Sequence, residues 1–324
     1  MKPMQLSHAF TGFLMDKEAT GKSPYTLRNY RNTFKRVKQF LKGEDSLITE
    51  IDRTVWVHFF AWLQRQKVGG AAPRDELLSS KTIYNIYTNL SAFYSWAVSI
   101  DLVERNLIKA IERPDYQSPP VDPYTREEVD ALLKVCERTA AWRNKPDVST
   151  ERSTMERDKA IIRLLLSTGI RASELCGITM GQIDLEHRSV MVNGKSRGRD
   201  PKTRMVYFGM RTRRSLWRYL ATLPDGRLSD APLFISKRGG PLTRHALYQL
   251  ISRLGERAGI DDCKPHRFRH TFAINYLRNG GDVLTLQVVL GHTSLRMVRL
   301  YAKIAAQDCQ RVHQKADPVD NWGL

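Results

Sequence analysis

Four prolines lie within ten consecutive residues of this chain: Pro114, Pro119, Pro120 and Pro123. Proline fixes its own backbone torsion and lacks an amide donor, so such a stretch continues neither a helix nor a central strand. The range 113–124 also has little apolar content, and we interpret it as an extended linker. A length of 324 residues is enough for about two domains, each with a core of its own. We therefore expect an N-terminal domain over 1–112 and a second domain over 125–324.

The sequence before the linker has the apolar periodicity of four helices. Their apolar positions include Leu6, Phe10, Phe13 and Leu14, then Leu27, Tyr30, Phe34 and Val37, then Val55, Phe59, Trp62 and Leu63, and finally Ile83, Ile86, Leu90, Phe93 and Ala97. Ser23 and Pro24 supply an N-cap and a first-turn proline for the second helix, and Ser79 or Ser80 would cap the fourth. The N-terminal domain is therefore expected to be a four-helix unit.

The sequence after the linker has a mixed pattern. Thr125 and Glu128 have the spacing of a capping box that opens a helix. Helical periodicity returns in three later segments: 161–166, 216–223 and 247–254. The segments 189–192 and 204–208 indicate two strands joined by a basic hairpin loop over 194–203. Two further segments are interpreted from composition, 233–235 as a short strand and 139–155 as a polar loop between helices. The predicted fold is mainly α with a small antiparallel β-sheet.

The charge balance narrows the class of partner. Lysine and arginine number 52 against 34 aspartate and glutamate residues, a net charge of +18. Such an excess favours a polyanion, nucleic acid before an anionic membrane. No apolar run approaches the roughly 20 residues of a membrane span, and residues 1–10 lack the apolar centre of a signal peptide. The four cysteines are far apart and form no Cys-x-x-Cys motif, which argues against a zinc module and suits a reducing cytoplasm.

Several side chains that suit phosphate chemistry lie in one late segment. A proline directly before His266 suits a helix start, and His266 and Arg269 would project from one face of that helix. The apolar residues of 284–289 predict another helix that ends at Gly291, so that His292 opens a turn. A phenol follows nine positions after His292. Each residue alone has an ordinary structural explanation, but the set of imidazoles, guanidinium and phenol indicates a phosphate-processing site.

A metal site is the alternative to this interpretation. His266 and His270 are four positions apart, which is the spacing of a helical zinc pair. However, no glutamate follows His266, and Arg267 and Arg269 would repel a cation. We therefore expect no metal at this helix.

In order and spacing, these residues resemble a tyrosine recombinase of the phage-integrase and Xer type. The resemblance is carried by Arg171 in the run Thr-Gly-Ile-Arg-Ala-Ser-Glu-Leu, by His266-x-x-Arg269, by Leu290-Gly291-His292 and by Tyr301. The step of 23 residues from Arg269 to His292 and the step of nine to Tyr301 also fit the family. The resemblance implies an N-terminal four-helix, SAM-like core-binding domain over 1–112, and a tyrosine-recombinase catalytic domain with a C-terminal tail over 125–324.

The resemblance assigns six catalytic residues: Arg171, Lys195, His266, Arg269, His292 and Tyr301. The tyrosine would attack the scissile phosphate and form a 3′-phosphotyrosyl link. The two arginines would hold the non-bridging oxygens, and the two histidines would add hydrogen bonds. The lysine would protonate the departing 5′ oxygen. Lys195 follows Arg171 by 24 residues, as in the family, and Lys202 in the same loop is the alternative. The resemblance implies no metal, no ATP and no other cofactor.

The resemblance also assigns candidates for DNA contact: Arg28, Arg31, Lys35, Lys81 and Asn85 in the first domain, and Arg197, Lys202 and Arg244 in the second. The cationic side chains would mainly hold phosphates, and Asn85 could recognise a base edge. A basic helix face is about as often only a solvated surface, so this alternative stays open.

The activity implied is site-specific recombination of double-stranded DNA through a Holliday junction, for integration, excision or dimer resolution. The family implies a homotetramer on two sites, one dimer per site, with a C-terminal helix over 305–314 docked on a neighbouring subunit. An accessory protein or a heteromeric recombinase partner is compatible with this. The expected location is the cytoplasm, in association with the nucleoid, with no membrane partner. Two alternatives remain: a type IB topoisomerase that relaxes supercoils, and a non-catalytic sequence-specific DNA-binding protein.

Overall fold

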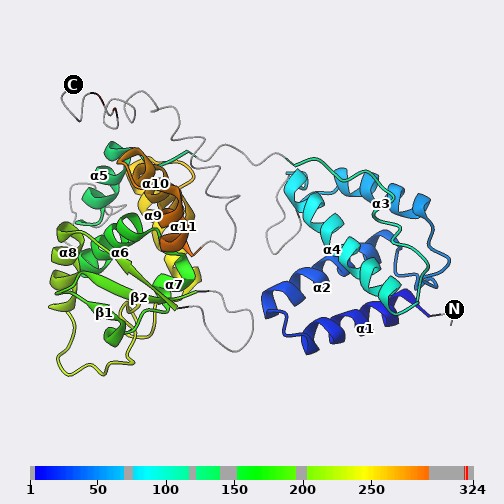
Figure 1. Cartoon of the computed structure of the whole chain (residues 1–324), viewed down its shortest axis with the longest axis horizontal. Helices are drawn as coiled ribbons and strands as arrows, with labels where there is room; N and C mark the ends of the chain where they lie inside the picture. Colours follow the sequence, from blue (N-terminus) through cyan, green and yellow to red (C-terminus); the bar gives the residue numbers. More distant parts are fainter. Residues whose placement is uncertain are drawn as a thin grey trace, which may run out of the picture. The chain divides into compact units, whose positions relative to one another are not determined.

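The computed structural model of the chain describes residues 4–68, 76–116, 122–138, 152–194, 203–291, 317 and 319. The chain divides into two compact units, Met1–Pro120 and Val121–Leu324, and each has its own hydrophobic core. The first unit is helical, and the second combines helices with one small antiparallel sheet (Figure 1). The predicted fold class is therefore confirmed. The division lies within the range that the sequence identifies as a linker, of which 117–121 lie outside the described residues.

The first unit contains the four predicted helices: α1 (Leu6–Ala19), α2 (Pro24–Phe40), α3 (Arg53–Gln64) and α4 (Ser80–Ser99). Side-chain caps begin three of them. The Ser23 hydroxyl accepts a hydrogen bond from the Thr26 amide at 3.2 Å, and Ser79 accepts one from Thr82 at 3.3 Å. Asp52 caps α3 in the same way. Each cap satisfies an amide that the helix itself leaves without an acceptor, which is worth about 1 kcal/mol.

Aromatic side chains fill the core of the first unit. Phe10 of α1 stacks on Phe34 of α2 with ring centroids 4.1 Å apart, and it also packs against Phe93 of α4. The Trp56 indole donates a hydrogen bond of 2.9 Å to the buried Tyr94 hydroxyl. Full burial of such a side chain contributes about 1.5–3 kcal/mol. These contacts hold α2 and α4 beside each other, so their exposed faces keep a fixed relation.

The second unit begins with the helices α5 (Arg126–Val135), α6 (Met155–Thr168) and α7 (Ala172–Cys176). The short 3-10 helix η1 (Met180–Gln182) leads into the strands β1 (Ile183–Asp184), β2 (Ser189–Asn193) and β3 (Thr203–Tyr207). The helices α8 (Met210–Leu220), α9 (Arg244–Ala258), α10 (Pro265–Arg278) and α11 (Val283–Leu290) follow. The capping box of Thr125 and Glu128 opens α5, as its spacing predicts.

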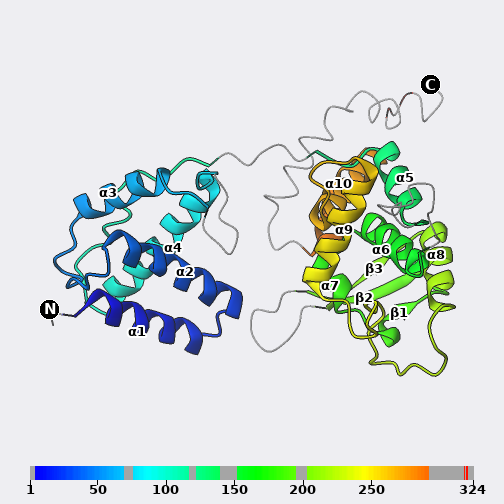
Figure 2. The same ribbon diagram turned by 180° about the vertical axis from the view of Figure 1, so that it is seen from behind.

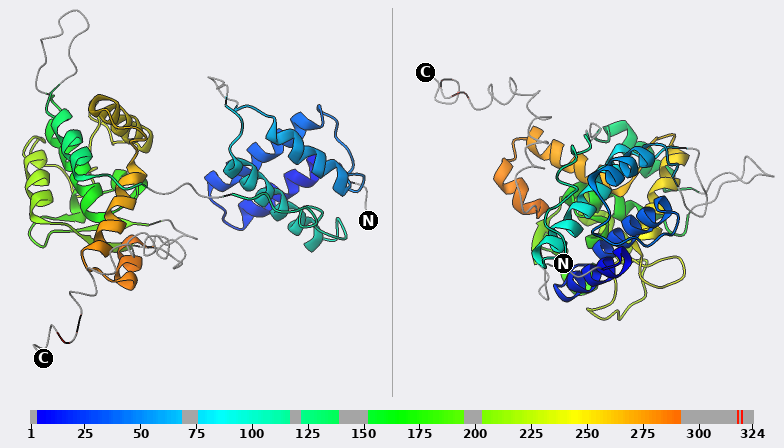
Figure 3. Two further views of the ribbon diagram at one scale, coloured as in Figure 1. Left: turned by 90° about the horizontal axis from the view of Figure 1, so that it is seen from above. Right: turned by 90° about the vertical axis from the view of Figure 1, so that its right-hand side faces the viewer.

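The sheet has the order β1-β2-β3 with antiparallel neighbours, and Val190 pairs with Val206 (Figure 2). Burial alternates along the strands, because successive side chains of a strand point to opposite faces. The buried face packs on helices, and β3 contacts both α6 and α11. Within this unit α6 lies between α8 on one side and α10 with α11 on the other (Figures 1 and 3).

Three details differ from the sequence-based expectations. The segment 233–235 adds no strand to the sheet: Ile235 forms an isolated bridge with Pro241, and the preceding Pro232 forms one with Thr179. The reason is that each bridge includes a proline, which has no amide to extend a ladder. The short strand β1 was not predicted. In α11 the apolar side chains of Leu284 and Val288 are 66% and 71% exposed, whereas the buried positions are Leu286 and Leu290.

Candidate active site

Three of the six predicted catalytic residues lie in the described part of the chain: Arg171, His266 and Arg269. Arg171 precedes α7, and the other two belong to the first turns of α10. Lys195, His292 and Tyr301 lie outside the described residues, as do Arg197 and Lys202. The described elements border two of these positions, because β2 ends just before Lys195 and α11 ends just before His292.

The Arg269 guanidinium joins the ends of two helices. Its side chain is 1% exposed, and its two terminal nitrogens donate hydrogen bonds to backbone carbonyls. Nη1 donates to the Gly169 oxygen at 2.8 Å, and Nη2 donates to the Leu290 oxygen at 2.7 Å. Gly169 ends α6 and Gly291 ends α11, each with φ near +61°. A buried cation is thus placed where α6 leads to Arg171 and α11 leads to residue 292.

Gly169 is required at this junction by two independent features. Its φ of +61° lies in the left-handed region, which side chains other than glycine rarely adopt. A Cβ atom at this position would also overlap Cδ1 of Phe272 and lie 3.0 Å from Leu290. The close approach of α10 and α11 to the end of α6 therefore depends on a residue without a side chain.

Arg171 is held by a buried carboxylate. Its backbone amide donates to Oε2 of Glu174 at 2.8 Å, and its Nη1 donates to Oε1 at 2.9 Å. The Glu174 side chain is almost completely buried, whereas that of Arg171 is 27% exposed. Glu174 therefore both caps the start of α7 and orients the guanidinium of Arg171.

Arg204 of β3 completes this network, although none of the sequence motifs includes it. Nη1 and Nη2 of Arg204 donate to the two carboxylate oxygens of Glu174 at 2.9 Å each. Its Nε donates to the Val289 oxygen at 2.7 Å. A Cβ atom at Gly291 would lie 3.0 Å from Nη1 of Arg204. One side chain therefore connects β3, α7 and the end of α11. A signal was present in the sequence, because strand alternation places Arg204 on the same buried face as Val206.

The electrostatics of this cluster favour an anion. Burial alone would raise the pKa of Glu174, but hydrogen bonds from Arg204 and from the Arg171 amide, with the positive charges of both arginines, lower that pKa to about 2. The carboxylate is therefore ionised at neutral pH. Three guanidinium groups, those of Arg171, Arg204 and Arg269, gather around the ends of α6, α7 and α11 with this one carboxylate between two of them. The excess positive charge suits a phosphate group.

The first turn of α10 distributes its side chains to different neighbours. His266 is exposed, and its ring meets the ring of His270 edge-on with centroids 4.6 Å apart. Arg267 turns away from the arginine cluster, since it donates to both Glu128 oxygens at 2.9 Å and lies over the Tyr124 ring. Arg269, one turn after His266, points to α6 and α11. Arg267 thus fixes α10 to α5, while Arg269 connects α10 to the ends of α6 and α11.

The DNA-contact candidates of the first unit lie on exposed faces of neighbouring helices. Arg28, Arg31 and Lys35 are exposed along α2, and Lys81 and Asn85 are exposed near the start of α4. The two helices are connected by a hydrogen bond of 2.9 Å from Asn89 to Thr33. The amine of Lys81 also donates to the Tyr116 hydroxyl at 3.0 Å and lies over that ring.

Arg244 is the remaining candidate in the described part, and it is exposed at the first position of α9. Burial raises the pKa of the Cys176 thiol to about 11, and the positive charge of Arg244 opposes that rise. Arg244 therefore lies close to the end of α7, the helix that follows Arg171. This places one candidate DNA contact near the arginine cluster.

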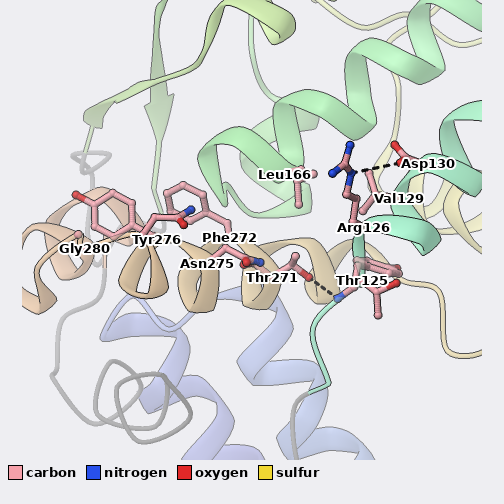
Figure 4. Close-up of a pocket in the computed structure, with 13 residues that line it drawn as sticks. Thr125, Arg126, Val129, Asp130, Leu166, Thr271, Phe272, Asn275, Tyr276 and Gly280 are labelled. Atoms are coloured by element: carbon pink, nitrogen blue, oxygen red, sulfur yellow. Dashed lines mark hydrogen bonds and ion pairs between the residues drawn. The ribbon is translucent and has the colours of Figure 1, made fainter. Parts of the chain in front are cut away.

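A cavity of about 690 Å³ lies between α5, α6 and α10 (Figure 4). Its lining is mainly apolar and includes Val129, Leu166, Phe272 and Tyr276, and it contains none of the predicted catalytic residues. Phe272 is the point of contact with the candidate site, because the same ring packs against Gly169. The cavity is therefore separate from the arginine cluster but shares one wall with it.

Two further classes of site are absent from the described part of the chain. It contains no group of three or more histidine, cysteine, aspartate or glutamate side chains arranged to hold a metal ion. None of the helices in 4–68, 76–116, 122–138, 152–194 and 203–291 combines the length and the apolar content that crossing a membrane requires.

Comparison with known proteins agrees with this geometry. Residues 124–308 match the phage integrase family, and residues 6–113 match the phage integrase SAM-like domain. The chain belongs to the phage integrase family. The family predicted from the arginine, histidine and tyrosine motifs is thereby confirmed, as is its assignment to the tyrosine recombinases of the Xer-like type.

Curated members of the family cover nearly all of the chain. The tyrosine recombinase XerC of Corynebacterium glutamicum is 30% identical over 299 residues, which is 92% of this chain and 87% of that protein. The tyrosine recombinase XerD of Shewanella oneidensis is 28% identical over 322 residues, 98% of this chain and 99% of that protein.

Solved structures share the fold of the phage integrase family. The integrase of the Tn1549 transposon, in complex with a circular intermediate DNA, superposes with a TM-score of 0.72 at 19% identity, covering 95% of this chain and 99% of that chain. A lambda integrase dimer bound to a COC′ core site gives 0.69 at 17% identity, covering 91% and 97%. At these identities the likeness supports the fold and nothing finer.

Proposed function

We propose that this member of the phage integrase family is a site-specific DNA recombinase that cuts and rejoins strands through a 3′-phosphotyrosyl intermediate and a Holliday junction. The observation that carries the proposal is the cluster of Arg171, Arg204 and Arg269 around Glu174, in a chain whose relatives are named tyrosine recombinases. The positive charge of the cluster suits an anion such as a phosphate, and the relatives' names point to the reaction.

In the proposed reaction the Tyr301 oxygen attacks the scissile phosphorus and displaces the 5′ oxygen of the next nucleotide. A phenol has a pKa near 10, so nearby cations must favour its ionised form. Arg171 and Arg269 stabilise the charge that builds on the non-bridging oxygens, with hydrogen bonds from the two histidines, and His266 helps to remove the phenolic proton. Lys195 protonates the departing oxygen, with Lys202 as the alternative. A 5′ hydroxyl from the partner strand reverses the step, so the reaction needs no metal and no ATP.

The DNA contacts proposed for this reaction come from both domains. We assign 1–112 to a core-binding domain, 113–124 to the linker and 125–324 to the catalytic domain with its tail. The exposed side chains of Arg28, Arg31 and Lys35 on α2 support this assignment, since they follow each other at three and four positions along one helix face. Lys81 and Asn85 on α4, Arg197 and Lys202 in the hairpin loop, and Arg244 on α9 are the other proposed contacts.

The proposed assembly is a homotetramer on two recombination sites, with one dimer per site. In this assembly a helix over 305–314, which lies outside the described residues, docks on a neighbouring subunit and couples cleavage to assembly. An accessory protein or a second recombinase could take part. The proposed location is the cytoplasm, in association with the nucleoid.

Covalent trapping tests the proposal. The full chain is incubated with nicked duplexes tiled across the DNA that flanks its own gene, and denaturant-resistant adducts are separated on a gel. The wild type should give an adduct at one sequence, and Tyr301→Phe should give none. Tyr207→Phe is the matched control, because Tyr207 is an exposed tyrosine of the same unit, and it should keep the adduct.

Each alternative gives a different result. An adduct that persists in Tyr301→Phe would rule out this nucleophile. An adduct accompanied only by relaxation of supercoiled plasmid, without exchange between two sites, would indicate the topoisomerase. Specific binding without an adduct on any nicked duplex would indicate a non-catalytic DNA-binding protein. The similarity to Xer recombinases favours neither of these two alternatives.

A further inference from the structure

The exposed face of α8 carries four arginines and a tryptophan that the candidate site does not use. The arginines are Arg211, Arg213, Arg214 and Arg218, and all four are exposed. Trp217, between them on the helix surface, is 62% exposed. The helix contains no aspartate or glutamate. Its opposite face, which includes Leu216 and Tyr219, is buried, and the helix packs on α6.

The arginine face of α8 consists of Arg211, Arg213, Arg214, Trp217 and Arg218. In the part of the chain that the structure describes, none of its four arginines forms an ion pair. A fifth arginine lies beneath it on α6, where Arg163 donates a hydrogen bond to the Ser215 hydroxyl of α8. Burial lowers the pKa of Arg163, the negative charge of Glu156 opposes this, and the positive charges of Arg218 and Arg211 add to the lowering. Like charges are thus crowded together, and an external polyanion would relieve their repulsion.

The arginine face is separated from the candidate site. Figure 1 shows α8 at the side of the second unit away from α7 and α11, Figure 2 shows the same separation from α7, and α6 lies between α8 and α10. A duplex whose phosphate contacts Arg171 next to α7 would therefore not be the stretch of DNA that α8 reaches.

We propose that the arginine face of α8 binds the phosphate backbone of duplex DNA outside the cleaved site. The proposal rests on the proposed recombinase function. Arg211, Arg214 and Arg218 form one stripe of about 10 Å along the helix, at 1.5 Å per residue. Phosphates of one DNA strand follow each other at about 3.4 Å along the duplex axis, so a stripe of this length spans several of them.

Other polyanionic partners fit this surface less well. Neither the cavity between α5, α6 and α10 nor the one along α9 is lined by a residue of the arginine face, whose arginines project from the exposed, convex side of one helix rather than into a groove for an acidic peptide. Binding in a membrane interface would need the apolar side of the helix, and that side is buried on α6. Guanidinium groups along a convex surface match a backbone of regularly spaced phosphates.

Salt-dependent binding tests the inference with the full chain. Two duplexes carry the same recombination site, one minimal and one extended by about 30 base pairs on each side, roughly 100 Å of axis. The test variant is Arg211→Gln/Arg214→Gln/Arg218→Gln. The control variant, Lys42→Gln/Arg105→Gln/Lys134→Gln, removes three charges from other surfaces. On the long duplex the slope of log binding constant against log salt should fall by roughly 3 in the test variant and by less than about 1 in the control.

Binding to the minimal duplex should be the same for the wild type and the test variant. A variant with lysine at the same three positions should keep most of the slope, which separates lost charge from lost folding. Equal slopes for wild type and test variant on the long duplex would overturn the inference, as would equal losses in test and control. Loss of poly-glutamate binding in the test variant, without a change in DNA slope, would overturn it in favour of an acidic protein.

The same experiment separates this inference from the proposed function. The wild type and the test variant could form equal amounts of covalent adduct on the minimal duplex and show the same salt slope on the long duplex. In that case only the proposed DNA binding by α8 is wrong. If the wild type forms no adduct on any duplex, the recombinase assignment itself fails.

Discussion

The side chain of Glu174 shows how much of the candidate site depends on one residue. It accepts three hydrogen bonds from two arginine side chains and a fourth from a backbone amide, and it does so from an almost completely buried position. An isolated carboxylate would be costly there, since burial disfavours its charge. The arginines reverse this preference, and the low pKa of Glu174 records the result.

That pKa makes stability depend on pH. The pKa of Glu174 falls from the ordinary value of 4.5 to about 2. This shift corresponds to a contribution on the order of 3 kcal/mol to the free energy of unfolding. Because the folded-state pKa is the lower one, the contribution is complete above pH 4.5 and is lost as the pH falls through about 2. We expect Glu174→Gln to lower the free energy of unfolding of the second unit at pH 7 by about 3 kcal/mol. Urea denaturation at several pH values should show the wild-type advantage shrinking below pH 4.5, and a difference that stays constant down to pH 2 would contradict the prediction.

The sequence motifs identified Arg171, His266 and Arg269 as candidates. They could not show which groups the guanidinium groups of the two arginines contact. Arg267 and Arg269 are both buried, they lie on the same helix, and only the family spacing distinguishes them. Their partners are far away in sequence: Glu128 for Arg267, and the carbonyls of Gly169 and Leu290 for Arg269. Arg204 was overlooked for the same reason, because its partners become neighbours only after folding.

At the scale of elements, the local chemistry of helix ends was the most predictable part of the fold. Ser23, Ser79, Thr125 and Gly291 each begin or end a helix as their residue types predict. Local signals suffice there because a cap involves only a few adjacent residues. The segment 233–235 was wrongly predicted as a strand from its apolar content, because pairing also depends on other parts of the chain: the Leu233 amide donates to the Ile178 carbonyl, and the segment is bordered by prolines.

The end of α6 offers a sharp test of this element-scale packing. Gly169 and Gly259 both end helices with positive φ, +61° and +68°. An added Cβ atom would meet Phe272 and Leu290 at Gly169, whereas it would enter open space at Gly259. We expect Gly259→Ala to cost about 1–2 kcal/mol for the backbone strain alone. Gly169→Ala should cost at least about 1 kcal/mol more, because Phe272 and Leu290 must shift. It should also reduce adduct formation, since the Gly169 carbonyl is an acceptor for Arg269.

Denaturant unfolding of the two alanine variants and adduct yield on the nicked site give the comparison. Equal losses of stability in the two variants would show that the strained backbone alone matters. Unchanged adduct yield in Gly169→Ala would show that the contact between Arg269 and the end of α6 does not position the reacting groups.

At the scale of the whole molecule, the two units have separate hydrophobic cores that support different surfaces. The aromatic core of the first unit holds α2 and α4 together, and the core of the second unit supports the arginine cluster. The linker prolines and the charge of +18 predicted two domains and a polyanionic partner from the sequence. Composition could not say which cations face DNA, because a solvated basic face and a binding face have the same sequence pattern.

DNA binding by variants of the basic face of α2 would distinguish a solvated face from a DNA-binding face. If Arg28, Arg31 and Lys35 hold phosphates of the recombination site, then Arg28→Gln/Arg31→Gln/Lys35→Gln in the full chain should weaken binding to a minimal duplex, and the slope of log binding constant against log salt should fall by roughly 3. Lys42→Gln/Arg105→Gln/Lys109→Gln removes the same charge from positions outside α2 and α4, and it should change that slope by less than about 1. Fluorescence anisotropy across a salt series measures both. Because the proposed catalytic residues all belong to the other unit, adduct yield in the test variant should recover once protein is in excess over the weakened binding constant. Equal slopes in the two variants would mean that the face of α2 is only solvated surface, and that the first unit meets DNA through other residues.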